Sequence, residues 1–239
     1  MSLQAQDFDE LVFRIESAYV ELGHTRGWRF LCGPRATLET SPDIALITAN
    51  PGGTHHTDGH GIESCESGSA YLTEAWGTTP GNHNLQRQIL ALFQLIAEHM
   101  VDEVSGEASL NTSLTAYYIP FRSPRLSELQ SAKQSVKFAE DLWTTIFSKH
   151  VPKLIVTIDH AAFRGVSAAI ERHSGKSMGD TKYPTGWGNV SAAKRAYRLP
   201  SGKLATVLRL PHLSTFKLFS RPQCAANLDL IVRESAADL

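Results

Sequence analysis

Two side chains that could carry out hydrolytic chemistry each follow an apolar run typical of a buried strand. The first is Asn50, which comes after the run IALITA and opens the loop Asn50-Pro51-Gly52-Gly53. An asparagine amide accepts and donates hydrogen bonds, so Asn50 can orient a nucleophilic water without taking its proton. Pro51 makes the loop rigid, while Gly52 and Gly53 let the backbone approach a ligand closely. We therefore expect Pro51, Gly52 and Gly53 to contact substrate.

The second candidate is His212, in the segment LPHLSTFK that follows the run LATVLRL. A hydrogen-bond donor at the end of a strand can stabilise negative charge that develops on a leaving group. Alone, NPGG is a common turn composition and a single histidine is usually structural. Together, a water-orienting asparagine after the first predicted strand and a histidine after the last form a more specific pair than either residue alone.

Other combinations of reactive residues are less convincing. Gly175-Lys176-Ser177 resembles part of a phosphate-binding loop, but Ile170 stands where that motif needs a glycine and no strand precedes it. No G-x-S-x-G segment is present for an acyl hydrolase. One loop contains four potential metal ligands, His55, His56, Asp58 and His60. No regular element is expected there to fix their geometry. We therefore expect neither a metal nor a cofactor.

The composition is that of a soluble protein. Apolar residues make up 42% of the 239 residues and charged residues 20%, as in ordinary globular chains. No apolar stretch reaches the roughly 18 residues that span a bilayer, and the segment MSLQAQDFDELVF lacks the pattern of a signal peptide. The three cysteines are too far apart in sequence to suggest a disulfide framework. We expect a cytoplasmic monomer with no membrane partner.

Charge is distributed unevenly along the chain. The net charge is −1, yet residues 181–228 contain no acidic residue and eight basic ones. These are Lys182, Lys194, Arg195, Arg198, Lys203, Arg209, Lys217 and Arg221. Such a basic segment indicates binding to a polyanion such as DNA, although it is also compatible with a solvated surface. Trp187, within this segment, is either a stacking platform for a base or a core residue.

Strands and helices alternate along the sequence. Buried strands are predicted at 44–49, 114–119, 154–158 and 204–210, the last reached through a hairpin that turns at Ser201-Gly202. Helices are predicted at about 5–22, 85–100, 127–148, 161–173 and 222–236, and long loops at 53–83 and 174–190. This order predicts a single α/β domain over residues 1–239. Its expected form is a three-layer α/β/α sandwich with a mostly parallel four-stranded central sheet.

Ligands of such sheets bind beyond the carboxyl ends of the strands. The segments that follow the predicted strands are 50–53, 120–122, 159–160 and 211–216. We therefore expect Asn50 and His212 to lie across one cleft at this edge, with Phe121 among the residues that contact substrate.

Four of these segments, in order, resemble motifs of the uracil-DNA glycosylase superfamily. ANPG at 49–52 is similar to the family's N-terminal G-x-N-P-G motif, and HLSTFK at 212–217 to its C-terminal H-P-S motif. LTAYYIPFRSP at 114–124 and VPKLIVTIDHAAF at 151–163 resemble the family's second- and third-strand regions. The resemblance extends from about residue 41 to residue 233.

The resemblance implies hydrolysis of the N-glycosidic bond of a damaged base, uracil or a related one, flipped out of single- or double-stranded DNA. Asn50 would hold the attacking water, and His212 would donate a hydrogen bond to the departing base. Ser214 would contact a phosphate, and Phe216 would fill the space that the flipped base leaves. Lys217 and Arg221, beside them, are expected to contact the DNA backbone.

The chain also departs from the family pattern. Leu213 replaces the proline of H-P-S, Thr48 stands where a glycine is usual, and Ala116 stands where many members have the asparagine that reads the base. Two other functions therefore remain open. One is a nucleic-acid or nucleobase-binding protein of the same fold without base excision. The other is a small-molecule hydrolase that uses a metal at His55 and His60.

Overall fold

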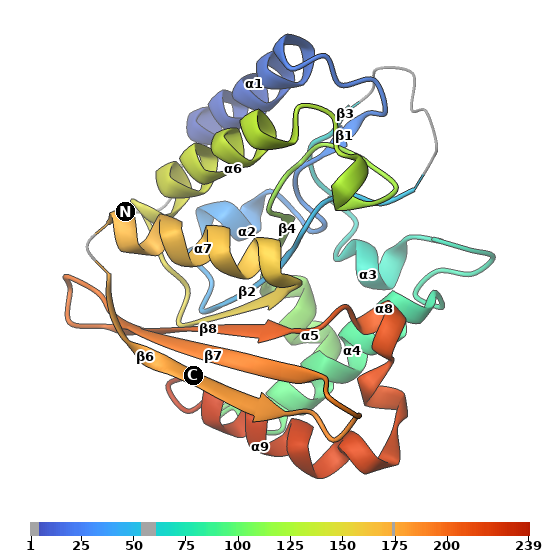
Figure 1. Ribbon diagram of the computed structural model, residues 1–239, viewed down its shortest axis with the longest axis vertical. Helices are drawn as coiled ribbons and strands as arrows, with labels where there is room; N and C mark the ends of the chain where they lie inside the picture. The colour runs from blue at the N-terminus through green and yellow to red at the C-terminus, as the bar shows by residue number, and fades with distance from the viewer. Residues whose placement is uncertain (1–4, 54–60, 174) are drawn as a thin grey trace.

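The computed structural model describes residues 5–53, 61–173 and 175–239. A six-stranded sheet forms its centre, in the order β4-β2-β5-β8-β7-β6 (Figure 1). The strands span Leu114–Tyr117 (β4), Ile44–Thr48 (β2), Leu154–Ile158 (β5), Leu204–Leu210 (β8), Ser191–Arg198 (β7) and Lys176–Pro184 (β6). β1 (Trp28–Arg29) and β3 (Gly61–Ile62) form a small separate parallel pair.

The first four strands of the large sheet are parallel, and they are the four predicted from the sequence. The predicted hairpin is also present, because β7 runs antiparallel to β8. The prediction of only four strands is wrong, since β6 pairs antiparallel with β7 where a loop over 174–190 was expected. The residues of β6 are exposed except Tyr183, so this edge strand lacks the apolar pattern by which buried strands are recognised.

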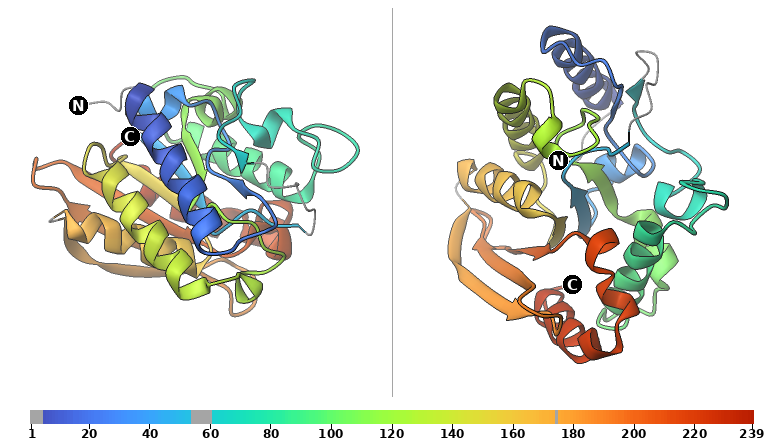
Figure 2. Two further views of the ribbon diagram at one scale, coloured as in Figure 1. Left: turned by 90° about the horizontal axis from the view of Figure 1, so that it is seen from above. Right: turned by 45° about the vertical axis from the view of Figure 1, so that its right-hand side comes forward.

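Helices cover both faces of the sheet (Figures 1 and 2). All five residues of β2 are buried, and their side chains alternate between two apolar clusters. Ala45 and Ile47 pack in the cluster of α1 (Ala5–Glu21), α6 (Ala132–Phe147) and α7 (His160–Arg172). Ile44 and Leu46 pack in the cluster of α4 (Asn84–Ala97) and α9 (Ala225–Ser235). The mostly parallel α/β arrangement expected from the sequence is thereby confirmed.

Short helices complete the layers. They are α2 (Ala36–Glu39), α3 (Ala70–Thr73), α5 (Gly106–Thr112) and α8 (Leu213–Phe216), with 3-10 turns η1 (Leu126–Glu128), η2 (Leu218–Ser220) and η3 (Pro222–Cys224). α3 and the 3-10 turns belong to segments that border the two cavities described below. Within the described part of the chain, no helix has both the length and the apolar composition that crossing a bilayer requires.

Close packing of α7 on the sheet depends on Gly165. A Cβ atom at this position would lie 1.9 Å from Cζ of Tyr118, which is itself fully buried. Glycine therefore lets α7 pack directly against the ring of Tyr118, which follows β4.

Candidate functional site

A cleft of 990 Å³ lies at the carboxyl ends of the parallel strands. Ligand sites typically have volumes of about 300–1,000 Å³, so this cleft is large enough for a sizeable organic molecule. Both Asn50 and His212 line it, as expected from the sequence. Polar and aromatic side chains also line it, among them Arg29, Glu74, Trp76, His83, Arg122, Ser123, Asp159 and Ser214.

Strand register explains how these residues come together. Thr48 of β2 pairs with Ile158 of β5, and Ile158 pairs with Leu210 of β8, so the three strands end side by side. Asn50 and His212 therefore follow strands that flank β5. Adjacent strands are about 4.8 Å apart, which separates the two strand ends by about 10 Å.

The Asn50 amide is held in one orientation by the neighbouring loop. Its Nδ2 donates to Oγ of Ser123 at 2.9 Å and to the carbonyl of Pro51 at 3.0 Å. Longer contacts join Nδ2 to the carbonyls of Phe121 and Ser123, at 3.5 and 3.4 Å. The amide nitrogen is thus used by the protein, and because no described residue donates to Oδ1, this is the atom left to accept a hydrogen bond from a ligand or water.

His212 can donate a hydrogen bond to a ligand, whereas Asn50 is oriented to accept one. The residue is exposed and stands at the N-terminus of α8, and its Nδ1 lies 2.9 Å from Oγ of Ser214 and 3.5 Å from Oγ1 of Thr215. When a hydroxyl donates to Nδ1, Nε2 carries the ring proton and can donate to a ligand. Ser214, expected to contact a phosphate, instead places its hydroxyl within hydrogen-bonding distance of the His212 imidazole.

An ion pair on another side of the cleft was not foreseen from the sequence. The Arg29 guanidinium donates to both Glu74 carboxylate oxygens, at 2.8 and 2.7 Å, and the side chain of Arg29 is only 6% exposed. Burial opposes the charged form of Glu74, but the hydrogen bonds from Arg29 and Trp76 hold the pKa of this carboxyl below its usual value. The pair attaches the segment after α3 to β1, and no local sequence pattern relates residues 29 and 74.

Trp76 is fixed by this ion pair. Its indole nitrogen donates to Oε2 of Glu74 at 2.8 Å, and Tyr71 packs edge-on against its ring at 5.0 Å between centroids. His83 makes a second edge-on contact at 6.3 Å. Trp76 is half-buried and lines the cleft, so it provides an aromatic surface of defined orientation.

The glycine loop borders the cleft as expected, because Gly52 and Gly53 both line it. Pro51 is buried and does not line the cleft, so, contrary to expectation, it is not placed to contact substrate. Its carbonyl instead accepts from Asn50 and from the Ser123 backbone nitrogen. Nη1 of Arg122 donates to the Gly52 carbonyl. Arg122 thereby links the loops that follow β2 and β4.

Phe121 lies in the core and does not line the cleft, so the expectation that its side chain contacts substrate is wrong. Its ring is fully buried and stacks on His24 at 4.2 Å and on Phe138 at 5.4 Å. A base could not stack on this ring without displacing core side chains. Only the Phe121 carbonyl faces the site, through the long contact with Asn50.

Residues after His212 form one rim of the site. Phe216 is partly buried against the apolar cluster that contains α4 and α9, while Lys217 is exposed. Arg221 donates from Nε to the Phe216 carbonyl at 2.8 Å, and its guanidinium carbon lies 3.6 Å from the centre of the Trp187 ring. Arg221 thus covers one face of Trp187, which makes that ring a poor stacking platform for a base.

The basic segment is not a continuous positive surface. Arg195 pairs with Asp180 and Glu171, and Lys194 with Glu234, all acids outside residues 181–228. Arg209 is only 9% exposed. The inference of one concentrated +8 patch is therefore corrected, because folding brings acidic side chains to the basic ones.

Three of the other basic residues, Arg198, Lys203 and Lys217, lie at opposite ends of β8. Arg198 and Lys203 flank the turn between β7 and β8, at the start of β8. His212 follows the end of β8, and this seven-residue strand spans about 20 Å. Lys217 lies beside His212 in sequence, so it is on the same side as the cleft.

Several further positions bear on the sequence analysis. Ala116 is buried in the cluster that contains α1 and α6 and does not line the cleft, so it cannot read a base. The cysteines are all free and buried. No group of three or more potential metal ligands occurs among the described residues. The loop with His55, His56, Asp58 and His60 lies outside the described residues.

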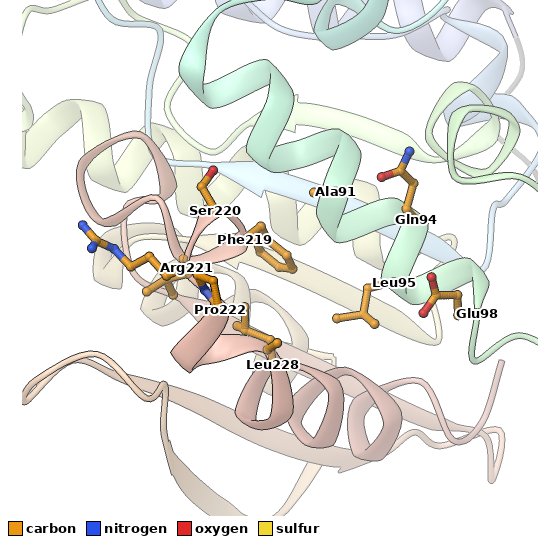
Figure 3. Close-up of a pocket in the computed structure, with 11 residues that line it drawn as sticks. Ala91, Gln94, Leu95, Glu98, Phe219, Ser220, Arg221, Pro222 and Leu228 are labelled. Carbon is orange, nitrogen blue, oxygen red and sulfur yellow. The ribbon is translucent and has the colours of Figure 1, made fainter.

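A second cavity, of 490 Å³, lies between α4, η2, η3 and α9 (Figure 3). Leu95, Phe219, Pro222 and Leu228 give it a mainly apolar lining, and Arg221 and Glu98 stand at its border. None of its lining residues also lines the cleft with Asn50 and His212, and none directly follows a parallel strand. The cleft with Asn50 and His212 is therefore the better candidate for a reactive site.

His24 supports the loop that holds Asn50, and its ionisation gives a test of this support. Burial lowers the pKa of His24 from 6.5 to about 4, and the ring lies on Phe121 with a nitrogen 2.9 Å from Oγ of Ser135. In the unfolded chain His24 becomes protonated as the pH falls through about 6.5, whereas in the folded chain it stays neutral until about pH 4. We expect the free energy of unfolding to fall by about 2 kcal/mol, attributable to His24, as the pH drops through this window.

Urea denaturation of the wild type and His24→Gln between pH 4.5 and 7.5 measures this contribution. The difference between the two proteins should shrink as the pH falls. A difference that is constant over this range would contradict the buried neutral state of His24.

The sequence matches no protein-family model, and it matches no curated protein sequence. The function of this chain must therefore be inferred from the chemistry of the cleft.

Proposed function

We propose that the protein is a monofunctional DNA glycosylase that hydrolyses the N-glycosidic bond of a damaged base, uracil or a related one. The observation that carries the proposal is the placement of Asn50 and His212 in one cleft, after strands that flank β5. Hydrolysis of this bond proceeds through an oxocarbenium-like sugar and an anionic base. A water acceptor and a hydrogen-bond donor, separated by about the width of two strands, suit these two developing charges.

The geometry of Asn50 supports its assignment to the attacking water. Because Nδ2 is committed to Ser123 and Pro51, Oδ1 is oriented as an acceptor before substrate arrives. An oriented water loses less freedom in the transition state, which accounts for a large part of catalysis in such reactions. The order of the motifs along the chain, which resembles the uracil-DNA glycosylase superfamily, supports the same assignment.

The geometry of His212 supports its assignment to the leaving base. Ser214 lies close to Nδ1 and allows the ring to donate from Nε2. A donor fixed in place stabilises the charge formed as the bond breaks more than it stabilises the ground state. This difference is what accelerates the reaction.

Base recognition is assigned to Trp76 in place of Phe121. Trp76 lines the cleft and is immobilised by Glu74 and Tyr71, so it offers a preformed face for a flipped base. An aromatic ring stacks on any base, so stacking on Trp76 does not by itself select uracil. Ala116 is buried in the core and adds no base-specific contact.

DNA is the proposed partner, contacted along the rim that follows His212. Lys217 is exposed there, and Phe216 precedes it at the end of α8. In this proposal Lys217 and Arg221 face the backbone, and Phe216 enters the duplex when the base leaves. Flipping costs a few kcal/mol, which such contacts offset.

A nucleic-acid or nucleobase-binding protein without excision is the second candidate, because alanine occupies position 116, where many members of the resembled family have the asparagine that reads the base. It requires the same cleft and the same aromatic surface, but no turnover. Catalytic measurements therefore separate the two candidates.

The catalytic prediction concerns single-turnover release of free base from oligonucleotides that carry uracil, hypoxanthine, xanthine or a mismatched thymine. His212→Ala should reduce the rate by about 10²–10³ with little change in DNA binding, because the lost hydrogen bond is strongest in the transition state. Asn50→Ala should cause a comparable loss through misorientation of the water.

His99→Ala serves as the control, since His99 pairs with Asp229 between α4 and α9, away from the cleft. Its rate should equal that of the wild type. Full activity in Asn50→Ala would exclude the water-positioning role. Base binding without release from any substrate would favour the nucleobase-binding protein.

The rim prediction concerns the salt dependence of DNA binding. Neutralisation of phosphates releases counterions, so Lys217→Ala should reduce the slope of log K against log salt by about 1. Lys203→Ala, at the far end of β8, should leave the slope unchanged. Fluorescence anisotropy of a labelled duplex between low and moderate salt provides the measurement. Equal effects of the two substitutions would mean that DNA does not bind along this rim.

The recognition prediction concerns Trp76 and free deoxynucleosides. Loss of a stacking surface costs about 1–3 kcal/mol per base, so Trp76→Ala should weaken deoxyuridine or deoxyinosine binding by about 5–150-fold. Trp76→Phe keeps a ring and should lose less. Trp187→Phe is the matched control, because that tryptophan does not line the cleft. Isothermal titration calorimetry measures these affinities. An unchanged affinity in Trp76→Ala would show that the Trp76 ring does not bind the base.

A further inference from the structure

Hydrolysis of a glycosidic bond leaves a proton that must go to some group. The proposed reaction, on which this inference rests, uses Asn50 to hold the water, and an amide does not act as a base at neutral pH. Among the described residues that line the cleft, two carry a carboxylate, Glu74 and Asp159. One of them is the natural acceptor for the proton of the attacking water.

Glu74 is already engaged. Both of its carboxylate oxygens accept from Arg29, and Oε2 also accepts from Trp76. Taking up a proton would break the hydrogen bonds of a nearly buried guanidinium, which is unfavourable. Glu74 is therefore suited to hold Trp76 in place and not to act as a base.

Asp159 has the better position. It follows β5 directly, and β5 lies between the strands that lead to Asn50 and His212. Its backbone nitrogen donates to the Leu210 carbonyl at 3.1 Å, which holds the residue close to the end of β8. Asp159 thus stands in the middle of the site, where the sugar of a nucleotide would lie between a water on Asn50 and a base on His212.

Asp159 has a strained backbone conformation that a glycine would adopt at lower cost. Its φ of 92° and ψ of 157° fall in a region that is essentially restricted to glycine. The residue is also the N-cap of α7, where Oδ1 accepts from the Ala161 backbone nitrogen at 3.0 Å. Glycine is almost as good an N-cap as aspartate and would relieve the strain. Capping therefore does not explain an aspartate at this position.

We infer that Asp159 is a catalytic residue that accepts the proton of the attacking water. As the C1′–N bond breaks, its electron pair passes to the base, and the sugar becomes positively charged. The water oxygen on Asn50 forms the new bond to C1′ while its proton passes to the Asp159 carboxylate. The base leaves as an anion hydrogen-bonded to His212 and is later protonated by solvent. Before proton transfer, the carboxylate charge also stabilises the cationic sugar.

Two substitutions separate charge from backbone conformation. Asp159→Asn keeps the size, the cap acceptor and the strain but removes the charge. Asp159→Gly removes the side chain and also the strain. Ser41→Gly is the matched control, because Ser41 has φ of 56° and precedes β2 at the end of the sheet away from the cleft.

The measurements are single-turnover base release, DNA affinity and thermal midpoint for each protein. Both Asp159 variants should lose about 10²–10³ in rate with nearly unchanged DNA affinity. Asp159→Gly and Ser41→Gly should each raise Tm by about 2–6 °C, since both relieve strain. Ser41→Gly should keep full activity. Sodium formate should restore part of the rate in Asp159→Gly, because a small carboxylate can occupy the vacated space, but not in Asp159→Asn.

The outcomes are distinguishable. Wild-type rates in Asp159→Asn and Asp159→Gly would overturn the role of Asp159 while leaving the proposed glycosylase in place. An inactive wild type on every substrate would overturn both. A lower Tm in Asp159→Gly with unchanged rate would assign the residue to helix capping alone.

Discussion

The parallel alignment of β4, β2, β5 and β8 is the constraint from which the rest of the structure follows. Because these strands are buried on both faces, their backbone polar groups must be paired within the sheet, and their ends coincide at one edge. The segments that leave this edge cannot continue the ladder. They form a cleft with unpaired polar groups available, and Asn50, Asp159 and His212 occupy three successive strand ends.

The sequence predicts those strands and helices whose burial leaves a recognisable pattern of apolar residues. The runs IALIT and LIVTI are continuous because both sheet faces are covered, and they correspond to β2 and β5. β6 was not predicted because an exposed edge strand needs no apolar pattern; only its ladder with β7 defines it. The basic segment was misinterpreted for a similar reason. Two of its charges, Lys194 and Arg195, are paired with Glu171, Asp180 and Glu234, which are close in space but lie outside it.

The candidate site was predictable only in part. Position after a strand identified Asn50 and His212 and included the segment with Asp159, but it could not show the backbone conformation that distinguishes Asp159. The same rule placed Phe121 in the site, whereas its side chain is buried in the core and stacks on His24. Arg29, Glu74 and Trp76 come from loops that only tertiary folding brings together.

The exposed strand β6 has a consequence for the behaviour of this protein at high concentration. The opposite edge of the sheet, β4, is covered by backbone contacts from residues 30–32. Among the described residues β6 has a strand neighbour on one side only, and an unpaired edge can add strands from other molecules. Lys176, Asp180 and Lys182 place charge along this edge. Such charge opposes intermolecular strand pairing, so it protects the chain from aggregation through its sheet, a role unrelated to any ligand.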